Sequence, residues 1–219
     1  MNARHGAREL LLILFTQLKK NSPNLTQKEI SNIILKSIRT LVNNAYEELK
    51  LSTGHLINMQ DYLDELELND EKNLERPFGL SNLPVPLPLT SDMQGKVNSL
   101  IDVAEKSFQA LEIAELSALS NNKEVIDFII KTTQTYQTNR KEIKELINES
   151  AIGWDFDRLL KIDKTILKLA TTELLFIQDT PVKVVVDEAV ELAKKYSSDE
   201  STSFINGILG QIIKVKNLK

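Results

Sequence analysis

The placement of the prolines constrains this chain more than any other feature of its sequence. Only six of the 219 residues are proline and seven are glycine, and four of the prolines fall between Arg76 and Leu89. Proline lacks a backbone donor and disfavours helix at the residue before it, so this stretch cannot be helical. Elsewhere apolar residues recur at spacings of three and four, which predicts an all-helical fold. Because the prolines of 76–89 alternate with Leu and Val, we expect an extended strip packed on the surface rather than a free linker.

Local signals mark where individual helices begin. Thr26-Gln27-Lys28-Glu29 has the form of a capping box, and Thr180-Pro181 pairs a capping residue with the residue favoured at the first helical position. We expect helices over 3–20, from about 26 to an interruption at Ser52-Thr53-Gly54, from there to about 68, and over 92–119, 123–149, 163–178, 181–196 and 200–216. We group these into an N-terminal helical sub-bundle, 1–150, and a C-terminal three-helix sub-bundle, 151–219. The first includes an acidic, proline-bearing insertion at about 49–119, which we expect to lengthen two helices.

The composition argues against several classes of protein. With no cysteine, the chain has no disulfide, thiolate nucleophile or zinc thiolate site, as suits the reducing cytoplasm in which we expect it. The longest apolar run, Leu10 to Phe15, is too short to cross a bilayer. His5 and His55 are the only histidines, and neither has metal-ligand spacing to a partner. We therefore expect no catalytic site, no metal and no cofactor.

Charge is distributed unevenly along the chain. The formal net charge of −4 argues against bulk binding to nucleic acid. Between Glu47 and Glu75 there are nine acidic residues, and the basic residues there are Lys50 and Lys72. Residues 1–20, by contrast, carry four basic side chains and one acidic one. The last nine residues likewise carry Lys214, Lys216 and Lys219 and no acidic residue. If RNA binds, we therefore expect it to bind locally.

The first helix carries a basic stripe that could meet RNA. At about 100° per residue, a stripe roughly 60° wide contains Arg4, Arg8, Phe15 and Lys19. Two guanidinium groups could align along a phosphate backbone, while an unstacked base could pack on the Phe15 ring. The alternative is that Phe15 belongs to the core and the arginines are ordinary solvated surface.

Three ordered blocks in the C-terminal third carry a more specific signal. Residues 154–174 contain W-x-x-x-R-L followed by I-D-K-T-I-L-K-L-A-T-T-E-L, and residues 181–196 read P-V-K-V-V-V-D-E-A-V-E-L-A-K-K-Y. The third block, residues 201–209, has the form S-x-x-F-I-N-G-I-L. In this order and spacing, the blocks resemble the NusB family over residues 154–209. Arg4 with Ala7-Arg8-Glu9-Leu10 is similar to the opening of that family.

The resemblance implies a fold and a set of partners. It implies two packed three-helix bundles that pair with the small-subunit ribosomal protein NusE and bind the boxA element of ribosomal RNA leaders. It also implies membership of an antitermination complex on RNA polymerase, and it leaves both a monomer and a homodimer open. By position, the residues expected near RNA are Arg4, Arg8, Asp163 and Lys164. Those expected to meet NusE are Tyr196, Glu200 and Phe204.

Two other functions compete with this one. A NusB-like domain also precedes a ribosomal RNA cytosine methyltransferase, but that enzyme class attacks its base with a cysteine, and this chain has none. The chain could instead be a helical protein–protein scaffold that keeps the fold without binding RNA. Its acidic middle and its few N-terminal arginines favour that alternative, which titration with boxA RNA would distinguish.

Overall fold

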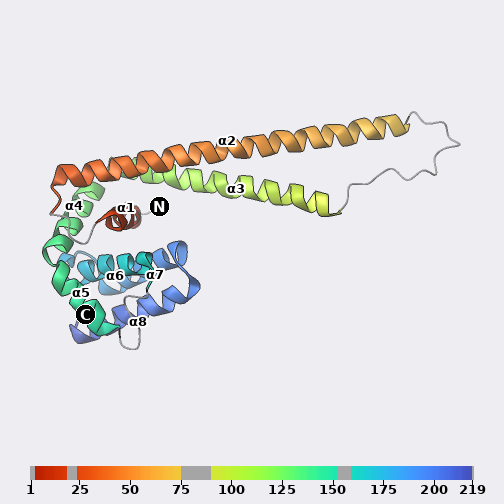
Figure 1. The fold of residues 1–219 in the computed structure, drawn as a ribbon. Coiled ribbons are helices and arrows are strands. Elements are labelled where there is room, and N and C mark those ends of the chain that lie inside the picture. Colours follow the sequence, from red (N-terminus) through yellow and green to blue (C-terminus); the bar gives the residue numbers. More distant parts are fainter. Residues whose placement is uncertain (1–2, 19–23, 75–89, 152–158, 219) are drawn as a thin grey trace. The chain divides into compact units, whose positions relative to one another are not determined.

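The computed structural model describes residues 3–18, 24–74, 90–151 and 159–218, and all regular structure within them is helical, which confirms the all-α class (Figure 1). The proline strip at 76–89 lies outside the described residues. The elements are α1 (Ala3–Gln17), α2 (Gln27–Leu74), α3 (Thr90–Leu119), α4 (Lys123–Thr138), α5 (Arg140–Ser150), α6 (Lys161–Thr172), the π-helical turn η3 (Glu173–Ile177), α7 (Val182–Tyr196) and α8 (Asp199–Val215). They divide into two compact units, one comprising Met1–Ile38 and Glu115–Lys219 and the other Arg39–Ala114.

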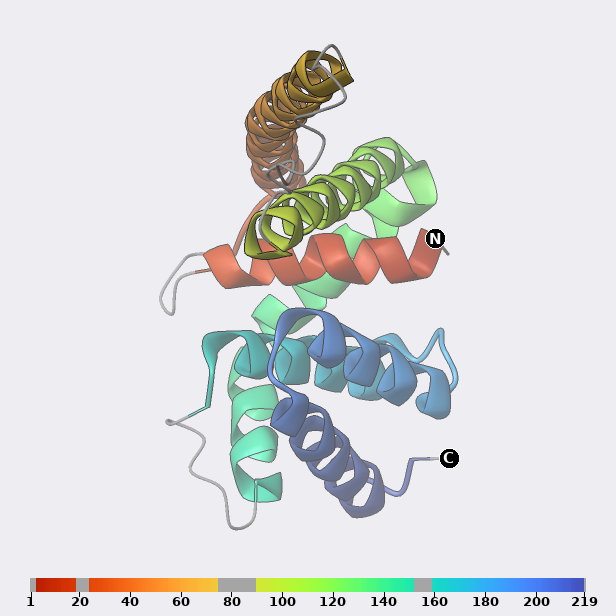
Figure 2. The same ribbon diagram turned by 90° about the vertical axis from the view of Figure 1, so that its right-hand side faces the viewer.

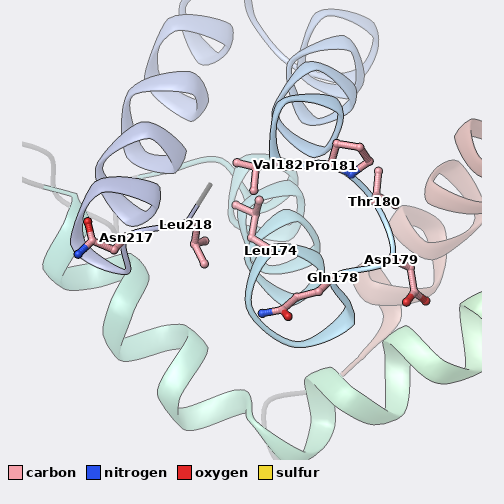
Figure 3. Close-up of a pocket in the computed structure, with 8 residues that line it drawn as sticks. All are labelled: Leu174, Gln178, Asp179, Thr180, Pro181, Val182, Asn217 and Leu218. Atoms are coloured by element: carbon pink, nitrogen blue, oxygen red, sulfur yellow. The ribbon is translucent and has the colours of Figure 1, made fainter.

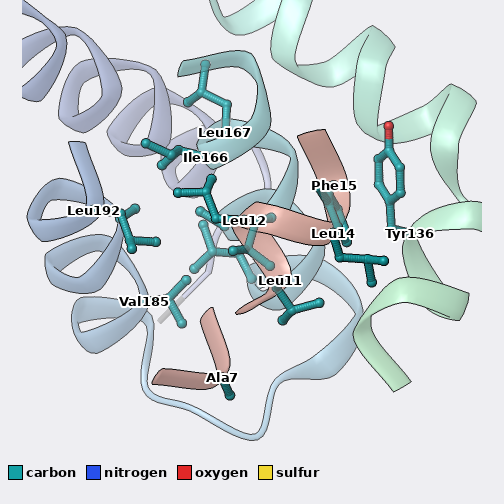
Figure 4. Close-up of a cluster of buried hydrophobic side chains, with 14 of the residues drawn as sticks. Ala7, Leu11, Leu12, Leu14, Phe15, Tyr136, Ile166, Leu167, Val185 and Leu192 are labelled. Atoms are coloured by element: carbon teal, nitrogen blue, oxygen red, sulfur yellow. The ribbon is translucent and has the colours of Figure 1, made fainter. Parts of the chain in front are cut away.

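The first unit, which we call the bundle, is built around α1 and α6. Helix α1 packs on α4 and α6, while α6, α7 and α8 contact one another (Figure 2). Leu11 of α1 and Ile166 of α6 lie in the apolar cluster that Val185 and Leu192 of α7 close from the other side (Figure 4). Burial of each such side chain contributes about 1.5–3 kcal/mol, so α1 is a central element of the bundle rather than a peripheral arm.

The capping box at the start of α2 is confirmed. The Glu29 carboxylate accepts hydrogen bonds from the Thr26 backbone N–H, at 2.8 Å, and from its hydroxyl, at 2.7 Å. The Thr26 hydroxyl in turn accepts one from the Glu29 N–H at 3.4 Å. These bonds to the charged form lower the pKa of Glu29, the backbone bond most. The predicted cap at Thr180 is wrong. Pro181 takes the N-cap position in an extended conformation, so α7 begins one residue later.

The single helix expected over 123–149 is also wrong, because the chain breaks at Asn139. The Asn139 side chain donates to the Thr135 carbonyl at 2.9 Å, and the Asn139 backbone N–H donates to the same carbonyl at 3.1 Å. Such local side-chain bonds compete with the helical ladder. The backbone therefore leaves the helix for one residue and restarts as α5.

The second unit, which we call the hairpin, consists of the far part of α2 and most of α3. The Lys106 ammonium lies 3.5 Å from the Glu48 carboxylate, and the Lys96 ammonium lies 4.6 Å from the centre of the Tyr62 ring. These two contacts show that the helices run antiparallel. Helix α2 continues unbroken from Gln27 to Leu74, so the expected interruption at Ser52-Thr53-Gly54 is wrong. Among the side chains described here, only Ser52 is buried, so the hairpin has almost no core of its own.

Candidate functional site

A buried ion pair joins the start of α1 to the π-helical turn. Arg8 Nε and Nη2 donate to the two carboxylate oxygens of Glu173 at 2.9 and 2.8 Å, and each residue is only 2% exposed. Glu173 is the first residue of the π-helical turn η3. Burial raises the pKa of Glu173, while the hydrogen bonds and charge of Arg8 act in the opposite direction. The bidentate contact pairs both charges at a buried position, where water cannot solvate them.

The ion pair extends into a network that fixes α1 against α7. Glu188 lies 3.6 Å from Arg8 Nη1 and 2.7 Å from His5 Nδ1. The next residue of α1 after Arg8 is Glu9, whose buried carboxylate accepts from Lys195 Nζ at 2.9 Å and from the Tyr196 hydroxyl at 3.0 Å. We call these residues the α1 anchor: His5, Arg8, Glu9, Glu173, Glu188, Lys195 and Tyr196. Because the anchor spans several helices, it holds the N-terminal helix in one orientation.

Arg4 is the residue of the predicted basic stripe that the structure places at the surface. It is exposed, and its guanidinium carbon lies 4.5 Å from the centre of the Phe128 ring. A cation over an aromatic face is held by the ring quadrupole. The exposed Arg4 side chain is therefore oriented by the Phe128 ring.

The other described residues of the predicted stripe do not form the expected row along a phosphate backbone. Arg8 points inward to Glu173, so the expectation that it lies beside Arg4 on the surface is corrected. Phe15 is buried, with its ring centre 4.7 Å from that of Tyr136 (Figure 4). A base could stack on it only if the core opened. Lys19 lies outside the described residues.

Asp163 has a structural position at the junction of α7 and α8. Its buried carboxylate accepts from the Ser197 hydroxyl at 2.6 Å and from the Ser201 hydroxyl at 3.0 Å. Its neighbour Lys164 is half-buried. The expected exposure of Asp163 along an RNA path is thus corrected, and the residue instead joins the start of α6 to the start of α8.

The three residues predicted to meet a protein partner differ in exposure. Tyr196 is 40% exposed although its hydroxyl is committed to Glu9, and Glu200 is exposed at the start of α8. Phe204 is 6% exposed, so most of its side chain belongs to the core. Both Glu200 and Phe204 nevertheless line a shallow pocket of about 330 Å³ on α8. The structure thus presents a carboxylate beside a partly apolar depression.

A larger pocket, of about 640 Å³, opens beside the turn that follows η3 (Figure 3). Gln178 turns the chain there with a positive φ of 53°. The pocket is lined by Leu174, Gln178, Asp179, Thr180, Pro181, Val182, Asn217 and Leu218. Its one ionisable side chain, Asp179, is held by Lys131 at 2.6 Å, a hydrogen bond that lowers the pKa of Asp179.

Within the described ranges there is no cluster of three or more His, Asp or Glu side chains that could hold a metal ion. Nor does any helix there combine the length and apolarity that a membrane span requires.

Most residues of the α1 anchor were not predicted from the sequence. The sequence nevertheless contains a signal for this cluster. Arg8 and Glu9 directly precede the apolar run of the first helix, and Glu173 interrupts the apolar run around Leu174. Charged residues on apolar faces are almost always paired when buried, so these opposite charges were candidate partners. Spacing alone does not say which charge meets which.

The described residues thus form helices only, with an anchored N-terminal helix and a shallow pocket on α8. The family model described as NusB family matches residues 92–214. The transcription antitermination protein NusB of Gloeothece citriformis is 31% identical over 213 residues, covering 95% of this chain and 92% of that protein. That of Crocosphaera subtropica is 34% identical, covering 94% and 92%. A solved structure of T. maritima NusB, 35% identical, covers 47% of this chain and 73% of that one with a TM-score of 0.42. The chain belongs to the NusB family of transcription antitermination proteins.

Proposed function

We propose that this protein is a non-catalytic antitermination factor that binds the boxA element of ribosomal RNA leaders in the cytoplasm, together with NusE, within an antitermination complex. The observation that carries the proposal is the exposed Arg4, held over Phe128 at the start of an anchored helix. Family membership supports the same function. The predicted roles of Arg8 and Asp163 become indirect, since both are buried and hold the elements that carry exposed residues.

On the RNA face, the anchor supplies preorganisation. A cationic side chain binds phosphate with less entropy loss when its helix is already fixed. Arg8 and Glu173 fix that helix one turn after Arg4, and the Phe128 ring restricts the guanidinium itself. We therefore expect Arg4 to contact a phosphate of single-stranded RNA. Lys164, in the first turn of α6, stays a separate predicted contact.

On the protein face, the depression on α8 is the docking site that we assign to NusE. Phe204 forms part of its wall, Glu200 stands exposed beside it, and the exposed edge of Tyr196 precedes it in the chain. An apolar pocket with a carboxylate at its side suits a partner segment that carries an apolar residue next to a basic one.

The test is a fluorescence anisotropy titration of boxA RNA and of a scrambled RNA at several salt concentrations, with and without NusE. Each phosphate contact on a single strand contributes about 0.7 to the slope of log affinity against log salt. Arg4→Ala should therefore flatten the slope by roughly 0.7, because Arg8 makes no second contact. Arg39→Ala, which removes an exposed arginine of the hairpin, is the matched control and should leave the slope unchanged.

The partner arm of the same experiment uses Glu200→Lys, with Glu145→Lys as the exposed control on α5. Glu200→Lys should weaken NusE binding and the control should not. Normal NusE binding with no boxA affinity in the wild-type chain would replace this proposal with the scaffold function.

A further inference from the structure

The hairpin exposes an unusual amount of apolar surface. Of the described large apolar side chains that are well exposed, most lie between Arg39 and Ala114, although this unit is less than half of the chain. On α3 they follow helical spacing: Met93, Val97, Leu100, Ile101, Phe108 and Leu111. Phe108 alone is 68% exposed. Contiguous apolar patches of this kind mark interaction surfaces in stable proteins.

The way in which α3 packs explains why this row is exposed. Both lysines of its described part, Lys96 and Lys106, reach toward α2. The face with the lysines therefore points to α2, and the apolar face points away from it. A helix with this arrangement leaves its more favourable packing face without a partner within the unit.

Helix α2 carries a matching row on the same side of the hairpin. Val42, Tyr46, Leu49 and Leu56 recur at spacings of four, three and seven, and all are exposed or half-buried. At about 100° per residue, the row on α2 lies roughly 100° around the axis of α2 from the α2 side chains that face α3. The row on α3 lies roughly 140° around the axis of α3 from the α3 side chains that face α2. Because the helices are antiparallel, these rotations turn both rows toward one side. The hairpin thus has one two-helix apolar face.

The two outer edges of this face carry opposite charges at nearly the same level along the helix axes. Lys50 lies on the outer edge of α2, and Glu105 lies on the outer edge of α3. Lys50 is two residues beyond Glu48, and Glu105 is one residue before Lys106, the partner of Glu48. In an antiparallel pair, these positions are therefore nearly level along the axis.

We propose that the apolar face of the hairpin pairs with the same face of a second copy of this chain, forming a four-helix bundle. A twofold axis parallel to the helices lays α2 of one copy over α3 of the other and makes every neighbouring pair antiparallel. The same operation sets Lys50 of each copy against Glu105 of the other. The face is thus self-complementary in charge as well as apolar. This pairing does not depend on RNA binding.

The test measures the oligomeric state of the full chain by sedimentation equilibrium at about physiological salt. The wild-type chain should dimerise, with a dissociation constant on the order of micromolar. Phe108→Glu should raise that constant by about tenfold or more, as for a truncated interface anchor. Leu51→Glu is the matched control, since Leu51 is 64% exposed on α2 but lies on the opposite side from the apolar face. It should leave the constant within about twofold.

A charge exchange tests the geometry. Lys50→Glu and Glu105→Lys each place like charges at two symmetric sites and should each weaken the dimer, whereas the double variant should restore it. Circular dichroism melting verifies that each variant is folded. A wild-type chain that stays monomeric at about 100 μM would overturn the proposal. So would a dimer that ignores Phe108→Glu but responds to Arg4→Ala, because a different face would then make the contact.

Discussion

Arg8 and Glu173 show how an ion pair can be essential to a fold without strengthening it greatly. Burying two charges costs several kcal/mol each, and their attraction repays this only with good geometry. Here the geometry is bidentate, at 2.9 and 2.8 Å. Removing one partner is expected to cost far more than the intact pair contributes, because it strands the other charge.

We predict that Arg8→Ala lowers the free energy of unfolding by about 3–5 kcal/mol, measured by urea denaturation at neutral pH. The double variant Arg8→Met, Glu173→Leu should recover most of this loss, since apolar replacement leaves no stranded charge. Arg4→Ala is the control and should change stability by no more than about 0.5 kcal/mol. Equal losses for Arg4→Ala and Arg8→Ala would contradict the burial of Arg8.

The raised pKa of Tyr196 predicts a loss of stability at alkaline pH. Burial raises the pKa of Tyr196 to about 12, and the nearby Glu9 carboxylate adds to the shift. An unfolded tyrosine ionises near pH 10 and the folded one near 12, so within that window the unfolded state binds fewer protons. The contribution of Tyr196 is therefore complete below pH 10 and is lost as the pH rises to about 12.

The measurement is thermal unfolding of wild type and Tyr196→Phe at several pH values. The variant should start less stable, because Glu9 loses a hydrogen bond, and should fall less steeply between pH 10 and 12. Parallel curves for the two proteins would show that Tyr196 titrates normally.

At the scale of elements, the start of α4 depends on a single side chain. The Asn122 side-chain oxygen, Oδ1, accepts from the backbone N–H groups of Glu124 and Val125, at 2.9 and 3.4 Å. Two donors that the helix cannot satisfy internally are thereby paired. Helix α4 carries Phe128, over which Arg4 lies, so this cap also bears on the candidate RNA face.

Asn122→Ala should therefore cost about 1 kcal/mol of stability, within the range of roughly 0.5–2 kcal/mol found for lost N-caps. The adjacent Asn121→Ala removes the same type of side chain from the end of the preceding turn, where it makes only a 3.4 Å contact with the Ser117 carbonyl. Its cost should be within about 0.5 kcal/mol. Chemical denaturation of the two variants compares them directly, and a larger effect at Asn121 would refute the assignment of the cap.

At the scale of the whole molecule, the two units differ in how much apolar surface they bury. The bundle has a continuous core, whereas Ser52 is the one buried side chain in the described part of the hairpin. Local stability follows buried apolar contact, so the hairpin should open more often than the bundle.

Hydrogen exchange measured by mass spectrometry at low protein concentration should show this difference. Amides in 39–62 and 93–114 should exchange at least about tenfold faster than those of α6, corresponding to roughly 1.4 kcal/mol less local stability. Raising the concentration should slow exchange in the hairpin if its apolar face pairs with a second copy. Uniform protection across both units would contradict the picture of a hairpin without a core.

Much of the local structure could be predicted from the sequence, because it depends on neighbours along the chain. The spacing of apolar residues predicted the helical class, and Thr26 with Glu29 predicted the start of α2. The ordered blocks of the C-terminal third predicted the family. The helical class and the start of α2 depend on residues within a few turns of one another, where helix geometry alone decides which groups meet. The family follows instead from the order and identity of blocks spread over residues 154–209.

The tertiary structure decided which faces meet. A helical wheel puts Arg4 and Arg8 on one stripe, yet Arg4 is exposed and Arg8 is buried. The difference arises because Glu173 lies 165 residues away in the chain and closes over only one of them. Asp163 is likewise buried by hydroxyls more than thirty residues away. Spacing determines which side chains share a face, but only the packing of distant elements determines whether that face meets water, a carboxylate or the core.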